Sequence, residues 1–161
     1  AMKWIAIALL AGAGLARADS PQRVTPLPKY QQECAACHLA YPPGMLPAAS
    51  WKRLMGSLDK HYGTDASLDE ASVREISGWL QTHAGTYKRV SEEPPQDRIT
   101  RSQWFVRKHS EVDPHIWKQA AVKSAANCAA CHTAADKGSF RESEIRFPKG
   151  LDARFRRNWS D

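Results

Sequence analysis

A repeated pentapeptide uses every cysteine in this chain of 161 residues. Cys34-Ala-Ala-Cys-His38 recurs as Cys128-Ala-Ala-Cys-His132. Two thiols at this spacing can each add to one vinyl group of a porphyrin, and the histidine that follows then faces the iron. The repeat therefore predicts two covalently attached haem c groups. The predicted attachment residues are Cys34, Cys37, Cys128 and Cys131, and the predicted first iron ligands are His38 and His132.

Three other uses of paired cysteines fit this sequence less well. A structural zinc site could take two C-x-x-C pairs, but it does not require a histidine directly after each pair. A thioredoxin-like redox pair needs one C-x-x-C beside a βαβ unit, and no such pattern is visible. Two disulfides would suit an exported protein but would leave both histidines unexplained.

The N-terminus has the pattern of an export signal. Met2 and Lys3 form a short basic start, residues 4–15 are apolar, and Ala16-Arg-Ala18 fits the small-x-small cleavage rule. We predict a signal peptide over residues 1–18 and a periplasmic protein. The apolar run is shorter than the roughly 18 residues that a spanning helix needs, so we expect no membrane-spanning segment.

The rest of the chain divides into two small halves. Residues 30–84 have helical periodicity, residues 85–98 contain Gly, Pro-Pro and charges typical of a linker, and no long alternating strand pattern is present. We predict a mostly α protein with one haem domain over residues 19–88 and another over residues 89–161. Domains this small bury little surface alone, so we expect the haem-free protein to be largely unfolded.

The second axial ligand of each iron decides what the protein can do. The candidates outside the two motifs are His61, His83, His109, His115, Met45 and Met55. Met55 lies off the apolar stripe of its segment, and we expect it to fill the core.

For the first haem, the spacing favours His61. A helix over residues 50–62 would place Trp51, Leu54, Leu58 and His61 on one face. A second apolar stripe, opened by a possible capping box at Ser67-x-x-Glu70, ends in His83. His83 stays open as the alternative, although a histidine in the last turn is also stabilised by the helix dipole without any metal.

For the second haem, the spacing favours His109. A possible capping box at Thr100-x-x-Gln103 opens a helix that would place Phe105, His109 and Val112 on one face. His115 remains the alternative. It follows Pro114, which is expected to start another helix with Asp113 as its cap, and histidines in a first turn are often solvent-exposed.

Several segments resemble the small soluble dihaem cytochromes c of purple bacteria. They are residues 34–47, the helix around Trp51, residues 61–63, 98–105, 123–132 and 138–148. The resemblance implies a class I cytochrome c domain followed by a second small, helix-poor haem-binding domain, with His61 and His109 as distal ligands. It also implies electron donation to an oxygen-binding monohaem cytochrome, the sphaeroides haem protein. The basic segment 149–157 is not part of the pattern.

Histidine on both faces of each iron would leave no position for a substrate. This favours an electron carrier and not an enzyme, and without a methionine thioether both potentials should be low. Tyr41, three residues after His38, either lies between the haems or packs on its own haem. Two alternatives stay open: a small dihaem subunit of a periplasmic reductase such as nitrate reductase, or a dihaem enzyme or gas-binding protein with one open iron site.

Charge is unevenly distributed along the chain. The formal net charge is +6; residues 19–94 carry eight Lys or Arg against nine Asp or Glu, whereas residues 95–161 carry thirteen against eight. We therefore expect the second half, including Arg154, Arg156 and Arg157, to meet an acidic patch on a small redox partner. We expect an upstream, membrane-bound electron donor, no nucleic-acid partner and a monomer.

Overall fold

The described chain is helical, as predicted. The computed structural model describes residues 24–86, 90 and 92–158, so the predicted signal peptide lies outside the described residues. The α-helices are α1 (Pro28–Cys34), α2 (Ala48–Met55), α3 (Glu70–Thr82) and α4 (Gln103–Lys108). Strands are absent from the described residues, where two isolated bridges join His61 with Thr64 and His132 with Ile145.

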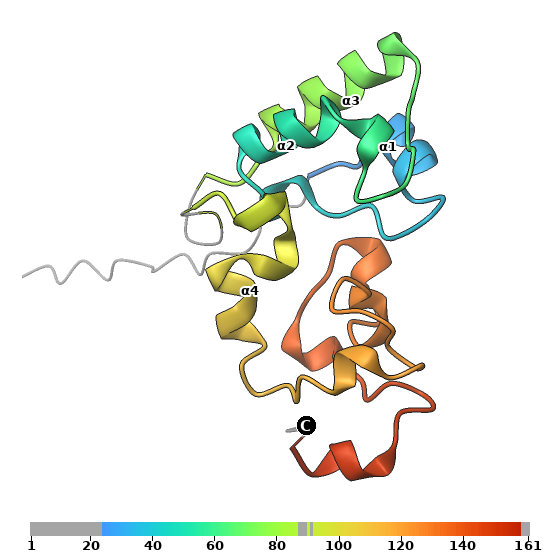
Figure 1. The fold of residues 1–161 in the computed structure, drawn as a ribbon, viewed down its shortest axis with the longest axis vertical. Helices are drawn as coiled ribbons and strands as arrows, with labels where there is room; N and C mark the ends of the chain where they lie inside the picture. Colours follow the sequence, from blue (N-terminus) through green and yellow to red (C-terminus); the bar gives the residue numbers. More distant parts are fainter. Residues whose placement is uncertain (1–23, 87–89, 91, 159–161) are drawn as a thin grey trace, which may run out of the picture.

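Short 3-10 turns connect the helices and make up most of the regular structure in the described second half. They are η1 (Pro43–Met45), η2 (Leu58–Lys60), η4 (Pro95–Asp97), η5 (Ile99–Arg101), η6 (Ile116–Lys118), η7 (Cys128–Ala130), η8 (Ala135–Lys137), η9 (Glu142–Glu144) and η10 (Ala153–Asn158). In Figure 1, α1 to α3 gather at one end, the turns of the second half gather at the other, and α4 lies along one side between them. No helix in the described part of the chain is long and apolar enough to cross a membrane.

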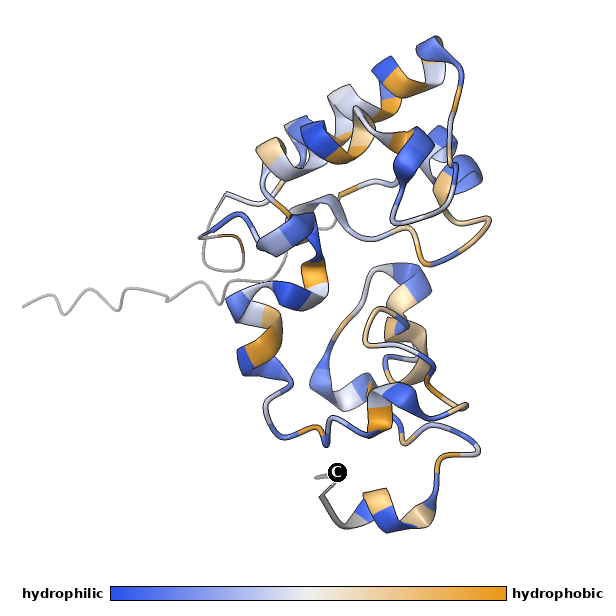
Figure 2. Ribbon diagram, in the orientation of Figure 1, coloured by the Kyte–Doolittle hydropathy of each residue, from blue (hydrophilic) through white to orange (hydrophobic). Residues whose placement is uncertain are grey.

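The first hydrophobic core lies between α2 and α3. Ile76 and Leu80, one helical turn apart on α3, are almost fully buried with Leu46 and Trp51. The Trp51 indole N–H donates to the Pro43 carbonyl at 2.7 Å, which satisfies its buried polar atom. Figure 2 shows apolar stretches interleaved with hydrophilic ones along α2 and α3, the pattern of helices with one buried face.

The predicted helix over residues 50–62 is wrong. α2 ends at Met55, Gly56 is its C-cap, and the chain tightens into η2 before His61. Glycine disfavours helix continuation, and the Ser57 hydroxyl donates to the Arg53 carbonyl at the end of the helix. His61 therefore follows a 3-10 turn and is not on the same helix as Trp51.

The helix starts and the end of α4 also differ from the predicted ones. Asp69 caps α3 by accepting from the Ser72 N–H, and Ser102 caps α4 by accepting from the Phe105 N–H, so neither predicted capping box forms. α4 ends at Lys108 with His109 as its C-cap, which leaves Val112 outside the helix. The Ser110 hydroxyl, which donates to a carbonyl in the last turn of α4, accompanies this early end.

A separate hydrophobic cluster forms in the second half without any α-helix. Ile116, Val122, Leu151 and Phe155 are its buried members. Leu151 and Phe155 belong to the basic tail segment, so this segment is part of the second core. The described second half is helix-poor, as predicted, while the domain boundaries at residues 88 and 89 stay a prediction.

Ile76→Ala should destabilise the protein by about 2–5 kcal/mol, because it opens a cavity where the native side chain is fully buried. The control is Glu75→Ala at an exposed position of the same helix, which should change stability by about 0.5 kcal/mol or less. Denaturant unfolding followed by circular dichroism measures both. Equal effects of the two substitutions would contradict the packing described for α2 and α3.

Candidate functional site

The structure brings each motif histidine together with one distant histidine. The ring centres of His38 and His61 are 6.1 Å apart, with an angle of 18° between the ring planes. Those of His109 and His132 are 6.2 Å apart, with an angle of 73°. These are the same partners that the sequence favours for the two haems.

The separation of the rings fits one metal atom between each pair. A metal–nitrogen bond of about 2 Å on each side, plus the distance from each nitrogen to its ring centre, places the ring centres roughly 6 Å apart. Within the described residues, no group of three or more His, Cys, Asp or Glu could hold a metal by itself. A metal in either place would thus take its remaining ligands from another group, and a porphyrin supplies four.

The four cysteines, which precede the two motif histidines in the chain, are unpaired thiols. Cys34 is the last residue of α1, and Cys128 opens η7. All four cysteines are free, so neither disulfide alternative forms. Burial raises the pKa of Cys34 and of Cys131 to about 11, which favours the thiol over the thiolate that zinc binds.

His61 is placed by a tight turn after η2. The His61 backbone N–H donates to the Leu58 carbonyl at 3.3 Å, and the Thr64 N–H donates to the His61 carbonyl at 3.0 Å. Tyr62 and Gly63, inside this turn, have left-handed backbones with φ values of 50° and 96°. Burial lowers the pKa of His61, with smaller contributions from His38 and Arg98, so the ring is kept neutral and able to bind a metal.

His38 shows which ring nitrogen is available. Its Nδ1 lies 2.7 Å from the Leu39 carbonyl oxygen. A carbonyl oxygen can only accept, so Nδ1 carries the proton and the lone pair of Nε2 is available for a metal.

The second pair is enclosed by aromatic rings. His109 Nδ1 donates to the Phe105 carbonyl at 2.9 Å, and the His109 ring stacks on the Phe105 ring with centres 4.0 Å apart. His132 lies 5.4 Å from the Phe140 ring, and burial lowers its pKa. A cavity of about 440 Å³ adjoins His109, and Phe105, Val112 and Trp117 are among the residues that line it.

The remaining candidates lie in other surroundings. His83 caps the end of α3, where its Nδ1 donates to the Trp79 carbonyl at 2.8 Å. His115 is an exposed residue whose Nδ1 lies 2.8 Å from the Asp113 carboxylate. Met45 and Met55 are buried. The structure therefore places His83 and His115 at helix or turn ends with partners of their own.

Tyr41 touches both halves of the molecule. Its ring stacks beside the His38 ring with centres 5.2 Å apart, and its hydroxyl donates to the Ala126 carbonyl at 2.8 Å. Ala126 lies two residues before Cys128, the start of the second motif. Burial, more than the nearby Cys128 and Tyr62, raises the pKa of Tyr41 to about 12, so the hydroxyl keeps its proton for this hydrogen bond.

The sequence interpretation missed two groups of residues around the pairs. The aromatic neighbours Trp117 and Phe140 were not identified, although Phe140 lies in one of the segments that carried the family resemblance. The contact of Tyr62 with Gln96 and Asp97 was also missed, because these residues lie 34 and 35 positions after Tyr62 in the sequence. No periodicity or short motif marks such a contact.

A family model for dihaem cytochrome c matches residues 30–140. Among solved structures, the chain is similar to DHC purified from Rhodobacter sphaeroides, with 46% identity over 73% of this chain and 100% of that one, and a TM-score of 0.63. It is also similar to a dihaem cytochrome c from Shewanella baltica OS155, with 32% identity over 76% of this chain and 95% of that one, and a TM-score of 0.66. No curated protein sequence matches the chain.

Tyr41→Phe should lower the stability of the protein by about 0.5–1.5 kcal/mol, because it removes the hydrogen bond to Ala126 and keeps the ring beside His38. Thr82→Ala is the control, since the Thr82 hydroxyl donates only within α3, to the Gly78 carbonyl. Thermal unfolding of the haem-loaded proteins measures both. A Tyr41→Phe protein as stable as the unmodified one would show that this contact does not hold the halves together.

Proposed function

The chain belongs to the dihaem cytochrome c family, and from this premise we propose that it is a low-potential electron carrier of the periplasm. It carries two covalently attached haem c groups, which when bound each take up and release one electron. The observation that supports the proposal is the pair of facing histidines in each half, 6.1 Å and 6.2 Å apart.

We assign the residues of the chain to the two haems as follows. Cys34 and Cys37 attach the first haem, with His38 and His61 as its axial ligands. Cys128 and Cys131 attach the second, with His132 and His109 as its axial ligands. The two ring separations of about 6 Å are the reason for these assignments.

Histidine on both faces suits a carrier and not an enzyme. A peroxidase or a gas-binding protein needs one iron face free, whereas here a ring occupies each side of both sites. In each pair one histidine donates from Nδ1 to a backbone carbonyl, Leu39 for His38 and Phe105 for His109. Such bonds make the imidazole a stronger electron donor, which favours ferric iron and a low potential.

We propose that electrons pass from a membrane-bound donor, through the two haems, to a small oxygen-binding monohaem cytochrome. Basic residues of the second half support docking on an acidic patch. Two of them have further contacts. Arg154 lies over the Phe155 ring at 4.8 Å and pairs with Asp152, and Arg156 lies over the Phe147 ring at 4.2 Å. The side chain of Arg157 lies outside the described residues.

His61→Met and His109→Met should each raise the potential of one haem and leave the other nearly unchanged, because methionine replaces an imidazole ligand. Ferric EPR can separate the sites, since ring orientation affects the iron orbitals, and the near-parallel and near-perpendicular pairs should give different low-spin signals. Each substitution should remove one signal. His83→Met and His115→Met are the controls and should change neither potential nor signal.

Carbon monoxide binding distinguishes an electron carrier from an enzyme with an open iron site. The reduced unmodified protein should bind almost none, because both irons keep two histidine ligands. Stoichiometric binding at either haem would contradict the carrier proposal.

The EPR measurements also test the ligand assignments. If His83→Met or His115→Met removes an EPR signal, the ligand assigned to that haem is wrong.

Electron transfer to the partner should slow as salt increases, because exposed charges are screened within about 8 Å at physiological ionic strength. Replacing the exposed Lys137, Arg141 and Lys149 together by Gln should flatten this dependence in stopped-flow measurements. The charge-matched control replaces Lys52, Lys60 and Arg74, exposed residues of the first half, and should keep the steep dependence. A salt-independent rate in the unmodified protein would exclude electrostatic docking.

A further inference from the structure

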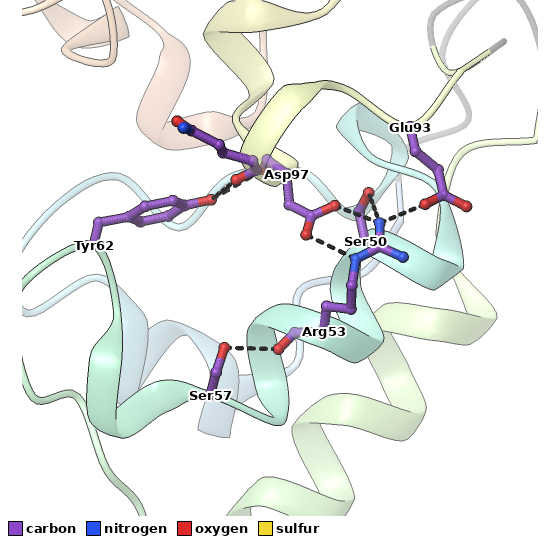
Figure 3. Close-up of polar contacts among 7 residues, drawn as sticks. Ser50, Arg53, Ser57, Tyr62, Glu93 and Asp97 are labelled. Carbon is purple, nitrogen blue, oxygen red and sulfur yellow. Dashed lines mark hydrogen bonds and ion pairs between the residues drawn. The ribbon is translucent and has the colours of Figure 1, made fainter.

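We propose that Tyr62 is a positioning residue for the His61 ligand, and that the segment joining the two halves holds Tyr62 in place. The proposal also concerns three residues that we call the linker latch: Arg53 of α2, and Glu93 and Asp97 of the segment that joins the halves. Figure 3 shows the latch beside the Tyr62 side chain. The inference rests on the proposed function, because it takes His61 as an axial ligand.

The need for a positioning residue follows from the ring nitrogen of His61. Nδ1 of His61 is buried and has no hydrogen-bond partner. His38 and His109, in contrast, are each fixed by an Nδ1 hydrogen bond to a backbone carbonyl. Axial histidines are usually oriented through that nitrogen. The orientation of the His61 ring therefore depends on the side chains packed against it.

Tyr62 supplies that packing. Its ring meets the His61 ring edge-on, with centres 5.0 Å apart and an angle of 60°. The Arg98 guanidinium lies 4.1 Å from the centre of the Tyr62 ring, in a cation–π contact. The Tyr62 hydroxyl donates to the carbonyls of Gln96 and Asp97, 3.1 Å from each. Although Tyr62 is 43% exposed, both its ring and its hydroxyl are tied to the joining segment.

The linker latch fixes the backbone of residues 96 and 97, to which the Tyr62 hydroxyl donates. Arg53 donates to both carboxylate oxygens of Asp97, at 2.9 Å and 2.6 Å, and to Glu93 at 2.5 Å. The two-point geometry with Asp97, whose side chain is 14% exposed, is the strong form of an Arg–carboxylate pair. The hydrogen bonds from Arg53 lower the pKa of Asp97, so its carboxylate stays charged at neutral pH.

Backbone strain is concentrated at the same contact. Tyr62, Gln96 and Asp97 have φ values of 50°, 59° and 53°, and Lys123 is the other non-glycine residue with positive φ in the described chain. Left-handed backbones at such residues persist when surrounding contacts over-determine them, and they cluster at functional sites. Here two strained turns are joined by the Tyr62 hydroxyl.

The consequence is that His61 is held by the joining segment as well as by its own turn. α2 anchors the latch, the latch fixes residues 96 and 97, and these bind the neighbour of His61. Loosening any link should let His61 leave the iron more readily, while the second pair, which has its own hydrogen bond at Phe105, should not change.

The test uses the haem-loaded full chain with Tyr62→Phe and Arg53→Ala. Tyr62→Phe removes the hydroxyl and keeps the ring. It should raise the affinity of reduced protein for carbon monoxide roughly two- to tenfold, the factor that one neutral hydrogen bond contributes. The EPR signal of the near-parallel pair should shift or broaden, and that of the near-perpendicular pair should stay. Arg53→Ala should do the same, and Arg53→Lys should have a smaller effect, because an ammonium group can still pair with the Asp97 carboxylate.

Ser57→Ala is the matched control. The Ser57 hydroxyl, just beyond the end of α2, donates to the backbone carbonyl of Arg53 and not to the side-chain groups of the latch, so carbon monoxide affinity and both signals should stay as in the unmodified protein. If Tyr62→Phe and Arg53→Ala also leave them unchanged, the positioning role is wrong. An equal rise in carbon monoxide affinity at both haems would also contradict the proposal, because it would indicate a general loss of structure. If His61→Met leaves both haems unchanged, the ligand assignment fails instead.

Discussion

The separation of two imidazole rings is the constraint on which both halves of the molecule depend. A ring pair 6.1 Å apart and another 6.2 Å apart can each hold one iron, and the remaining structure brings the two rings of each pair to opposite sides of one site. Neither half has a large core: the first buries its apolar residues between α2 and α3, and the second has only a small cluster around Ile116 and Phe155. Cores of this size gain much from a large apolar group, which the two haems provide.

The two pairs have nearly the same ring separation, but a different histidine is fixed by a hydrogen bond in each. In the first pair the motif histidine, His38, is fixed through Nδ1 to a carbonyl and the distant histidine is not. In the second pair the distant histidine, His109, is fixed and the motif histidine, His132, has a buried Nδ1 without a partner. The difference follows from helix geometry, because His109 follows α4 and can reach the Phe105 carbonyl at its end, whereas His61 follows a short 3-10 turn. We therefore expect the two haems to differ in reduction potential, although each has two histidine ligands.

The family, the helical fold and the two haem groups could be predicted from the sequence, because the repeated pentapeptide is a local motif with a fixed chemistry. The facing of His61 toward His38 also agrees with the sequence, but the helix from which it was inferred does not exist. The chain leaves α2 at Gly56, and the turn that follows η2 brings the His61 ring opposite the His38 ring. Contacts such as Arg53 with Asp97 join residues 44 positions apart, and no periodicity encodes them.

The basic tail shows how packing and charge can share one segment. Residues 149–157 lie beyond the family match, which ends at residue 140, yet Leu151 and Phe155 of this tail complete the second core. Arg154 and Arg156 lie over phenylalanine rings, which restricts their side chains and keeps their charges close to the surface of the second half. A segment held in this way presents positive charge in a defined place. In the docking that we propose, its charge would orient the acidic partner while its apolar residues hold the segment on the second core.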